Sequence, residues 1–391
     1  MNNYFETMNN CRDYIRNNPN VKEGYENMDG SNCSGFEYTL QNSMAVKLRV
    51  DKKIDYVIME VYPGITVRGT HQSMVAEYCQ RVSECPGLGY LAVDVDQGNV
   101  YLHCESSFRD NPVTSKLLKM MEETAVAMLD KHVPIIECLA YGRLPNCPFP
   151  LMEAPVESIA MVVNAEEQDL LDANIEEIRV HLANSGHNVA AENLNPDSPI
   201  RYFLETISGN MRYREYIRIL QNGWMFRTVR LDTKCGEAYR TQLAQYANEA
   251  SDEKKVGFLK IGSDGYPYCT VATYLLGDKL ISKKTLEEMV SIAATFLKNS
   301  EEKLLYIGHG VLPPKSEGHD DVMSSIAKDM LGRMGGRPPM RERDRTGDSS
   351  PTSLLDLFSS LKSDDESDGD SMRDLMGMLH PDEDDDDELD F

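Results

Sequence analysis

Gly89-Tyr90-Leu91 returns 168 positions later as Gly257-Phe258-Leu259, and this repetition decides the fold. The same offset relates a longer series of positions, in which Lys116, Leu118, Met121, Ala125 and Leu129 return as Lys284, Leu286, Met289, Ala293 and Leu297. A period of this length is the size of a small domain and too long for a solenoid of short units. The sequence therefore predicts two tandem copies of one domain.

Each copy alternates between the two periodicities of regular structure. Apolar residues recur at helical spacing at its start, in its middle and at its end, and period-two alternation between them predicts strands. The clearest predicted strands cover 44–50, 56–61, 89–94 and 99–105 in the first copy, and 213–220, 224–231, 258–261 and 268–273 in the second. Asp96-Gln97-Gly98 and Ser263-Asp264-Gly265 indicate hairpin turns, and Thr114 and Ser282 suit the N-caps of the closing helices. The predicted class is α+β, an antiparallel sheet with packing helices in the order α-β-β-β-α-β-β-α.

Composition shifts set the predicted domain limits. The first copy covers 1–147, a proline-rich linker 148–169, the second copy 170–314 and an acidic tail 315–391. Each copy has enough apolar residues for its own core, so we expect each to fold as a unit. The tail is too charged to collapse and is predicted to be disordered.

The net charge of the chain argues against some classes of binding partner. The 391 residues carry a formal net charge of −24, and the segment from Met340 to Phe391 holds five basic and 18 acidic residues. Such a surface repels phosphate backbones and anionic lipid, so we expect neither nucleic acid nor membrane partners. No secretory leader pattern and no run of eighteen apolar residues occurs, which favours a cytoplasmic protein. Nine scattered cysteines without a CxxC pair predict free thiols rather than a disulfide framework.

Two apolar islands interrupt the tail and are the candidate partner-binding residues. Each has helical spacing but is too short to be a stable helix alone, so it would become ordered on a partner or on the body of the same chain. The residues are Leu354, Leu355, Leu357, Phe358 and Leu361 in the first island, and Met372, Leu375, Met376 and Leu379 in the second.

No motif commits the chain to catalysis, a cofactor or a metal. Asp94, Asp96 and Glu105 imitate a calcium loop but lack its turn glycine, since Asn99 stands there, and an acidic hairpin turn is the preferred interpretation. His309, His319, Asp320 and Asp321 lack a further ligand at fixed spacing. Nucleophile and phosphate-binding signatures are absent as well. We therefore expect no catalytic residue, no cofactor and no metal.

The order of elements, with the segments 89–101 and 116–129 and their copies, resembles the domain shared by type III secretion chaperones and bacterial YbjN-like proteins. The resemblance implies a non-enzymatic protein that holds partly unfolded polypeptide along its sheet and helices. It also implies that the two copies form internally the pair that secretion chaperones form as dimers. The family has no functional residues that can be transferred one by one.

The leading hypothesis is thus a cytosolic polypeptide-binding module, chaperone-like or regulatory. An alternative within this class is self-occupancy, in which a tail island fills the groove until a client displaces it. One alternative is a small-molecule sensor or enzyme with a site between the copies. Another is an adaptor that acts through short linear motifs in the tail, because Leu354–Phe358 is similar to a clathrin-box peptide.

Overall fold

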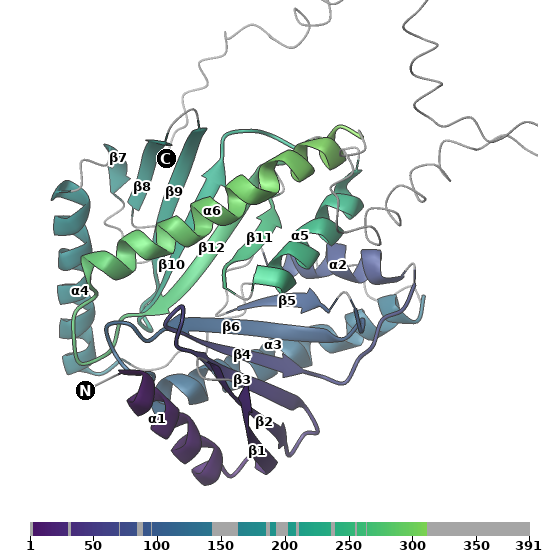
Figure 1. Cartoon of the computed structure of the whole chain (residues 1–391), viewed down its shortest axis with the longest axis horizontal. Coiled ribbons are helices and arrows are strands. Elements are labelled where there is room, and N and C mark those ends of the chain that lie inside the picture. The colour runs from purple at the N-terminus through teal and green to yellow at the C-terminus, as the bar shows by residue number, and fades with distance from the viewer. Residues whose placement is uncertain are drawn as a thin grey trace, which may run out of the picture. The chain divides into compact units, whose positions relative to one another are not determined.

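The computed structural model describes residues 3–29, 33–69, 71–83, 89–94, 96–142, 163–184, 188–192, 202–208, 211–235, 239–254, 256–262 and 264–310. These residues all belong to one compact unit, Met1–Asp329, and the second unit, Met330–Phe391, lies outside them. The predicted α+β class is confirmed, because the described residues form helices and two separate antiparallel sheets (Figure 1).

The two copies have the same element order. The first consists of α1 (Asn3–Asn17), β1 (Val21–Asp29), β2 (Cys33–Leu40), β3 (Ala45–Asp51), β4 (Tyr56–Tyr62), α2 (His71–Val82), β5 (Gly89–Val93), β6 (Val100–Ser107) and α3 (Ser115–Ala140). The second consists of α4 (Ala165–Asn184), β7 (Asn188–Glu192), β8 (Tyr202–Ser208), β9 (Met211–Ile219), β10 (Trp224–Leu231), α5 (Arg240–Lys254), β11 (Phe258–Ile261), β12 (Pro267–Tyr274) and α6 (Lys283–Gly308). The sheet orders are β1-β2-β3-β4-β6-β5 and β11-β12-β10-β9-β8-β7.

Four strands precede the middle helix of each copy, one more than the sequence predicts. In the first copy β1 (Val-Lys-Glu-Gly-Tyr-Glu-Asn-Met-Asp) has no apolar alternation, because Lys22 to Asn27 are exposed on an edge strand. A strand without a buried face leaves no period-two signal. The helix α4 begins at Ala165, inside the segment predicted as linker.

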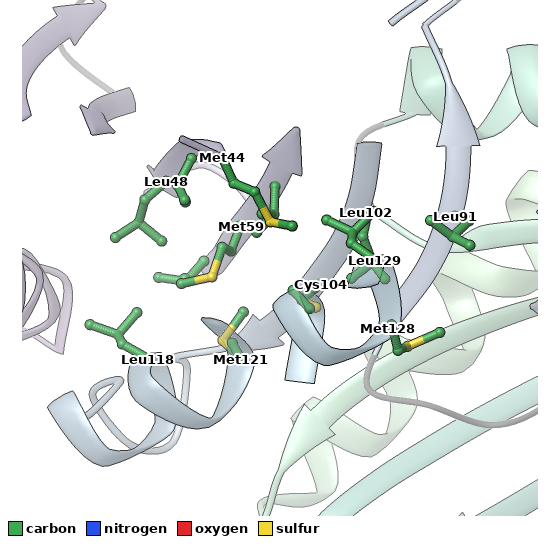
Figure 2. Close-up of a cluster of buried hydrophobic side chains, with 14 of the residues drawn as sticks. Met44, Leu48, Met59, Leu91, Leu102, Cys104, Leu118, Met121, Met128 and Leu129 are labelled. Atoms are coloured by element: carbon green, nitrogen blue, oxygen red, sulfur yellow. The ribbon is translucent and has the colours of Figure 1, made fainter. Parts of the chain in front are cut away.

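The first core lies between α1, α3 and one face of the first sheet. Figure 2 shows Leu48, Met59, Leu102 and Cys104 from the strands, Met44 from the turn before β3, and Leu118, Met121, Met128 and Leu129 from α3. The α3 methionines Met120, Met121 and Met128 are buried, so they fill the core rather than form a binding surface. Leu129 and its copy Leu297 are both fully buried, as their shared place in the repeat requires.

The predicted helix caps and hairpins are confirmed. Thr114 Oγ1 accepts a hydrogen bond from Leu117 N and Ser282 Oγ from Thr285 N, each at 3.2 Å. β5 pairs with β6, and β11 with β12, as antiparallel hairpins. The turn glycines Gly98 and Gly265 have φ of 72° and 81°, the left-handed region that such turns require.

Candidate functional site

The two copies meet through reciprocal contacts. Helices α2 and α5 lie side by side, and β6 packs against β12 (Figure 1). Ser73 Oγ hydrogen-bonds Gln245 Oε1 at 3.0 Å, while Thr241 Oγ1 donates to Glu77 Oε2 at 2.8 Å. Ser73 corresponds to Thr241 and Glu77 to Gln245 at the offset of 168, so the two bonds are one contact made twice. This is the pattern of an isologous, two-fold interface.

The same reciprocity blocks one edge of each sheet. Asn248 of α5 holds the outer edge of β5, since its Nδ2 donates to Val93 O at 2.6 Å and its Oδ1 accepts from Val93 N at 2.9 Å. Gln80 of α2, its equivalent in the first copy, donates to Leu259 O of β11 at 3.2 Å. Ser83 and Ser251, also equivalent, accept from Leu91 N and Leu259 N. These bonds occupy backbone groups of Leu91, Val93 and Leu259 that an added strand would need.

His103 and Glu105 are buried at this interface, and the half-buried Glu60 lies on the other side of His103. His103 Nε2 lies 3.3 Å from Glu105 Oε2, and its Nδ1 lies 3.7 Å from Glu60 Oε1. Glu105 also accepts from Gly257 N at 2.9 Å and from Ala272 N at 3.3 Å, both in the second copy. Burial lowers the pKa of His103, but the hydrogen bonds and charges of Glu105 and Glu60 outweigh it, so the pKa is raised.

A stack of rings lies beside this cluster at the interface between the copies, which we call the seam. Tyr90 stacks between His103 and Phe258, with ring centroids 4.6 and 4.1 Å apart. A pocket along the seam, between Asp110 and Thr273, measures about 10 Å³, room for a single water. This pocket is too small for an organic ligand, and the alternative of a small-molecule site between the copies stays a prediction.

The face of the first sheet opposite α1 and α3 is open over β1, β2 and β3. We call this surface the open face and define it by Tyr25, Asn27, Gly35, Glu37, Lys47 and Arg49. These residues are exposed or half-buried, and Tyr25 is 61% exposed. A hollow of about 200 Å³ lies in this face, lined by Asn27, Gly35, Glu37, Lys47 and Arg49 and by Ile58 and Glu60 of β4.

The carboxylates beside the hollow accept hydrogen bonds from tyrosines. Tyr25 Oη donates to Glu37 Oε2 at 2.6 Å, and Tyr62 Oη donates to Glu60 Oε2 at 2.8 Å. The hydrogen bond to Glu37 raises the pKa of Tyr25. The β1 strand forms one side of the open face, and among the described strands it pairs with β2 alone, so its other edge is an outer edge of this sheet.

The sequence-predicted candidates lie elsewhere. The nine tail residues Leu354 to Leu379 and His319, Asp320 and Asp321 fall outside the described residues. Asp94 Oδ1 accepts from the backbone of Asp96 and Gln97 in the hairpin turn, whereas Glu105 points into the second copy. His309 caps α6 through its backbone N–H. In the part of the chain that the structure describes, no three His, Cys, Asp or Glu residues are grouped to hold a metal ion.

Sequence reasoning missed the open face for a physical reason. Lys47 and Arg49 alternate with Val46, Leu48 and Val50, which marks them as outward-facing, but an outward polar residue is the ordinary case in a half-buried strand. Only the register with Gly35 and Ile58 shows that a hollow lies there.

No helix among the described residues is apolar and long enough to cross a bilayer.

Comparison with known proteins gives weak likenesses. No family model and no curated protein matches the chain. Among solved structures, it is similar to YbjN, a proposed transcription regulator from E. coli, with 15% identity and a TM-score of 0.21 over 34% of this chain and 87% of that one. It is also similar to the di-domain ARO/CYC protein StfQ of the steffimycin biosynthetic pathway, with 8% identity and a TM-score of 0.14 over 79% of this chain and 96% of that one. A second di-domain ARO/CYC protein, BexL, gives 10% identity and a TM-score of 0.14 over 80% of this chain and 95% of that one. At these TM-scores we infer no function from the likenesses.

Proposed function

We propose that the chain binds a polypeptide segment, without catalysing a reaction, and that the segment lies on the open face of the first sheet. The observation that carries the proposal is the hollow of about 200 Å³ in a sheet face that leaves its side chains partly exposed. A pocket of this size takes a side chain rather than a drug-sized molecule, for which sites are larger.

Two further features support a polypeptide as the ligand. β1 lies at the border of the open face and is an exposed edge strand of nine residues, and such an edge can pair with an extended backbone. The sheet edges at the seam are formed by β5 and β11, and there Asn248 and Gln80 bond to backbone groups. This favours the edge at β1 for an added strand. Tyr25 supplies an exposed aromatic ring next to the hollow, a side-chain type enriched in binding sites.

A photo-cross-linking experiment tests this proposal. Benzoylphenylalanine is introduced in place of Tyr25 on the open face or in place of Phe5 on α1, two side chains that are each 61% exposed. The full-length chain is irradiated with reduced, carboxymethylated lactalbumin as an unfolded polypeptide. We expect a cross-linked product from position 25 and little from position 5. Equal yields from the two positions, or none from position 25, would show that the open face is not the binding surface.

A further inference from the structure

Arg49 lies in a cross-strand row of the first sheet in which both of its immediate neighbours are uncharged; the acid of this row, Glu105, lies beyond Ile58 and accepts hydrogen bonds from Gly257 N and Ala272 N. In this row Gly35 of β2 lies opposite Arg49, and Ile58 of β4 lies opposite it on the other side. The adjacent row, Glu37, Lys47 and Glu60, alternates in charge, and both of its carboxylates accept tyrosine hydroxyls. Cross-strand neighbours in one row are the closest side chains on a sheet face. The guanidinium of Arg49 is therefore the cationic group at the floor of the hollow that lacks a facing carboxylate among the described residues.

The guanidinium is incompletely bonded. Arg49 Nε is buried and has no hydrogen-bond partner in the described part of the chain. A buried donor without an acceptor costs free energy that a bound acceptor would recover. Gly35 keeps the space above the arginine open, since a side chain there would project into the hollow that both residues line.

The second copy shows how the same position looks when it is closed. Arg218 corresponds to Arg49, because Phe226, which lies opposite it, corresponds to Ile58. The Arg218 guanidinium lies 4.9 Å from the centroid of the Phe226 ring, and burial lowers its pKa to about 10. Ile58 offers no such ring, so Arg49 faces the hollow where Arg218 is covered by an aromatic face.

We propose that Arg49 forms a carboxylate-binding subsite, which an aspartate or glutamate side chain of the bound polypeptide enters. This inference rests on the proposed function and specifies the chemistry that the open face selects. The planar fork of a guanidinium matches a carboxylate with two parallel hydrogen bonds. Ile58 provides an apolar wall for the methylene groups of the entering side chain. Glu37 and Glu60 in the next row repel a doubly charged phosphate more than a singly charged carboxylate, which favours the latter.

Peptide selection tests the subsite. A random dodecapeptide phage library is selected on the full-length chain, on Arg49→Met and on the matched control Arg218→Met. We expect an acidic residue at one fixed position of the peptides enriched by the wild type and by Arg218→Met, and its loss with Arg49→Met. Replacing that acid by its amide should weaken binding to the wild type about tenfold. Peptides that keep the acid with Arg49→Met, or that show no acid with the wild type, would overturn the proposal.

A second measurement uses the wild-type chain and needs no peptide. The Nε–Hε NMR signal of Arg49, assigned by its absence from Arg49→Lys, is followed during titration with N-acetyl-glutamate N-methylamide and with its glutamine analogue. We expect a saturable shift with the glutamate compound and none with the glutamine compound, while the Arg218 signal stays in place. If no peptide is enriched but Arg49 responds, polypeptide binding is wrong and the subsite stands. If the glutamate compound leaves the Arg49 signal unmoved, the subsite is wrong whatever the library gives.

Discussion

At the scale of single residues, duplication supplies a natural comparison between two cores. In the second core Arg227 and Glu215 form a fully buried pair, with Arg227 Nη2 2.6 Å from Glu215 Oε2 and Nη1 donating to Leu286 O at 2.7 Å. The cross-strand register places Met59 and Val46 at these positions in the first core. The same backbone thus holds an ion pair in one copy and two apolar side chains in the other.

We predict that breaking this pair is costly and that replacing it is not. Arg227→Met removes the guanidinium that bonds the buried carboxylate of Glu215 and should lower the free energy of unfolding by about 3–5 kcal/mol. The double change Arg227→Met and Glu215→Val installs the residues of the first core and should recover most of that loss. Urea unfolding of the two variants measures both values. A double variant no more stable than the single one would show that the second core has no room for the apolar pair.

His103 makes the stability of the folded protein depend on pH, and its contribution decreases as pH rises. Its folded-state pKa is raised above the unfolded value of about 6.5, because Glu105 and Glu60 together outweigh the effect of burial. The stabilisation is therefore fully present below the unfolded pKa and is lost as pH rises through the folded pKa. His132 behaves oppositely, since burial lowers its pKa to about 4, so a comparison of variants is needed to isolate His103.

We predict that the stability difference between the wild type and His103→Gln is largest near pH 6 and shrinks as pH rises. Glutamine keeps a polar side chain but carries no titrating charge between Glu60 and Glu105. The measurement is the free energy of unfolding in urea at several pH values between 6 and 9. A difference that stays constant or grows with pH would mean that His103 is not charged in the folded protein.

At the scale of elements, the sequence predicts those strands and helices that bury a face. β10 begins and ends where the alternation indicates, and α3 and α6 begin directly after their predicted caps. The polar β1 gives no comparable signal, because it buries so little. The open face and its hollow could not be predicted for the same reason, since they depend on the register between β1, β2 and β3 rather than on the pattern within any one strand.

The matched caps allow a prediction about the closing helices. Thr114→Ala and Ser282→Ala each leave a backbone donor of the first helical turn without its acceptor and should each cost about 1 kcal/mol. Thr114→Ser keeps the hydroxyl and should cost less than Thr114→Ala. Thermal and urea unfolding give these values, and a double alanine variant should show nearly additive losses because the two caps belong to separate helices. If only one of the two alanine variants loses stability, the helix of the other is held by tertiary packing alone.

At the scale of the whole molecule, the duplication predicts that there are two copies but not how they meet. The interface depends on pairs that are far apart in sequence, such as Asn111 Nδ2 with Lys279 O and Lys279 N with Asn111 Oδ1, both at 2.8 Å. Asn111 and Lys279 are equivalent positions, so this contact lies where the two-fold relation maps each copy onto the other. Buried side chains of both copies share the clusters there, including Trp224 and Phe226 with the first core and Tyr56 and Ile58 with the second.

This reciprocity leads to a prediction about the halves of the chain. Residues 1–147 contain both sides of the contact, since Ser73 and Glu77 could pair with Glu77 and Ser73 of another molecule. We expect this half to fold, as its own core of α1, α3 and sheet requires, and to form a homodimer that covers Tyr90 and Ile58. Sedimentation velocity measures the association.

Two variants of the half separate this interface from nonspecific association. Tyr90→Glu places a charge in the aromatic stack and should shift the half to monomer or to aggregate, whereas Phe5→Glu, on the exposed surface of α1, should leave the dimer intact. A well-folded monomer from the unmodified half would show that the pairing depends on side chains present only in the second copy. Asn248 would then be the first candidate, because its carboxamide makes two hydrogen bonds to β5, whereas Gln80 makes one to β11.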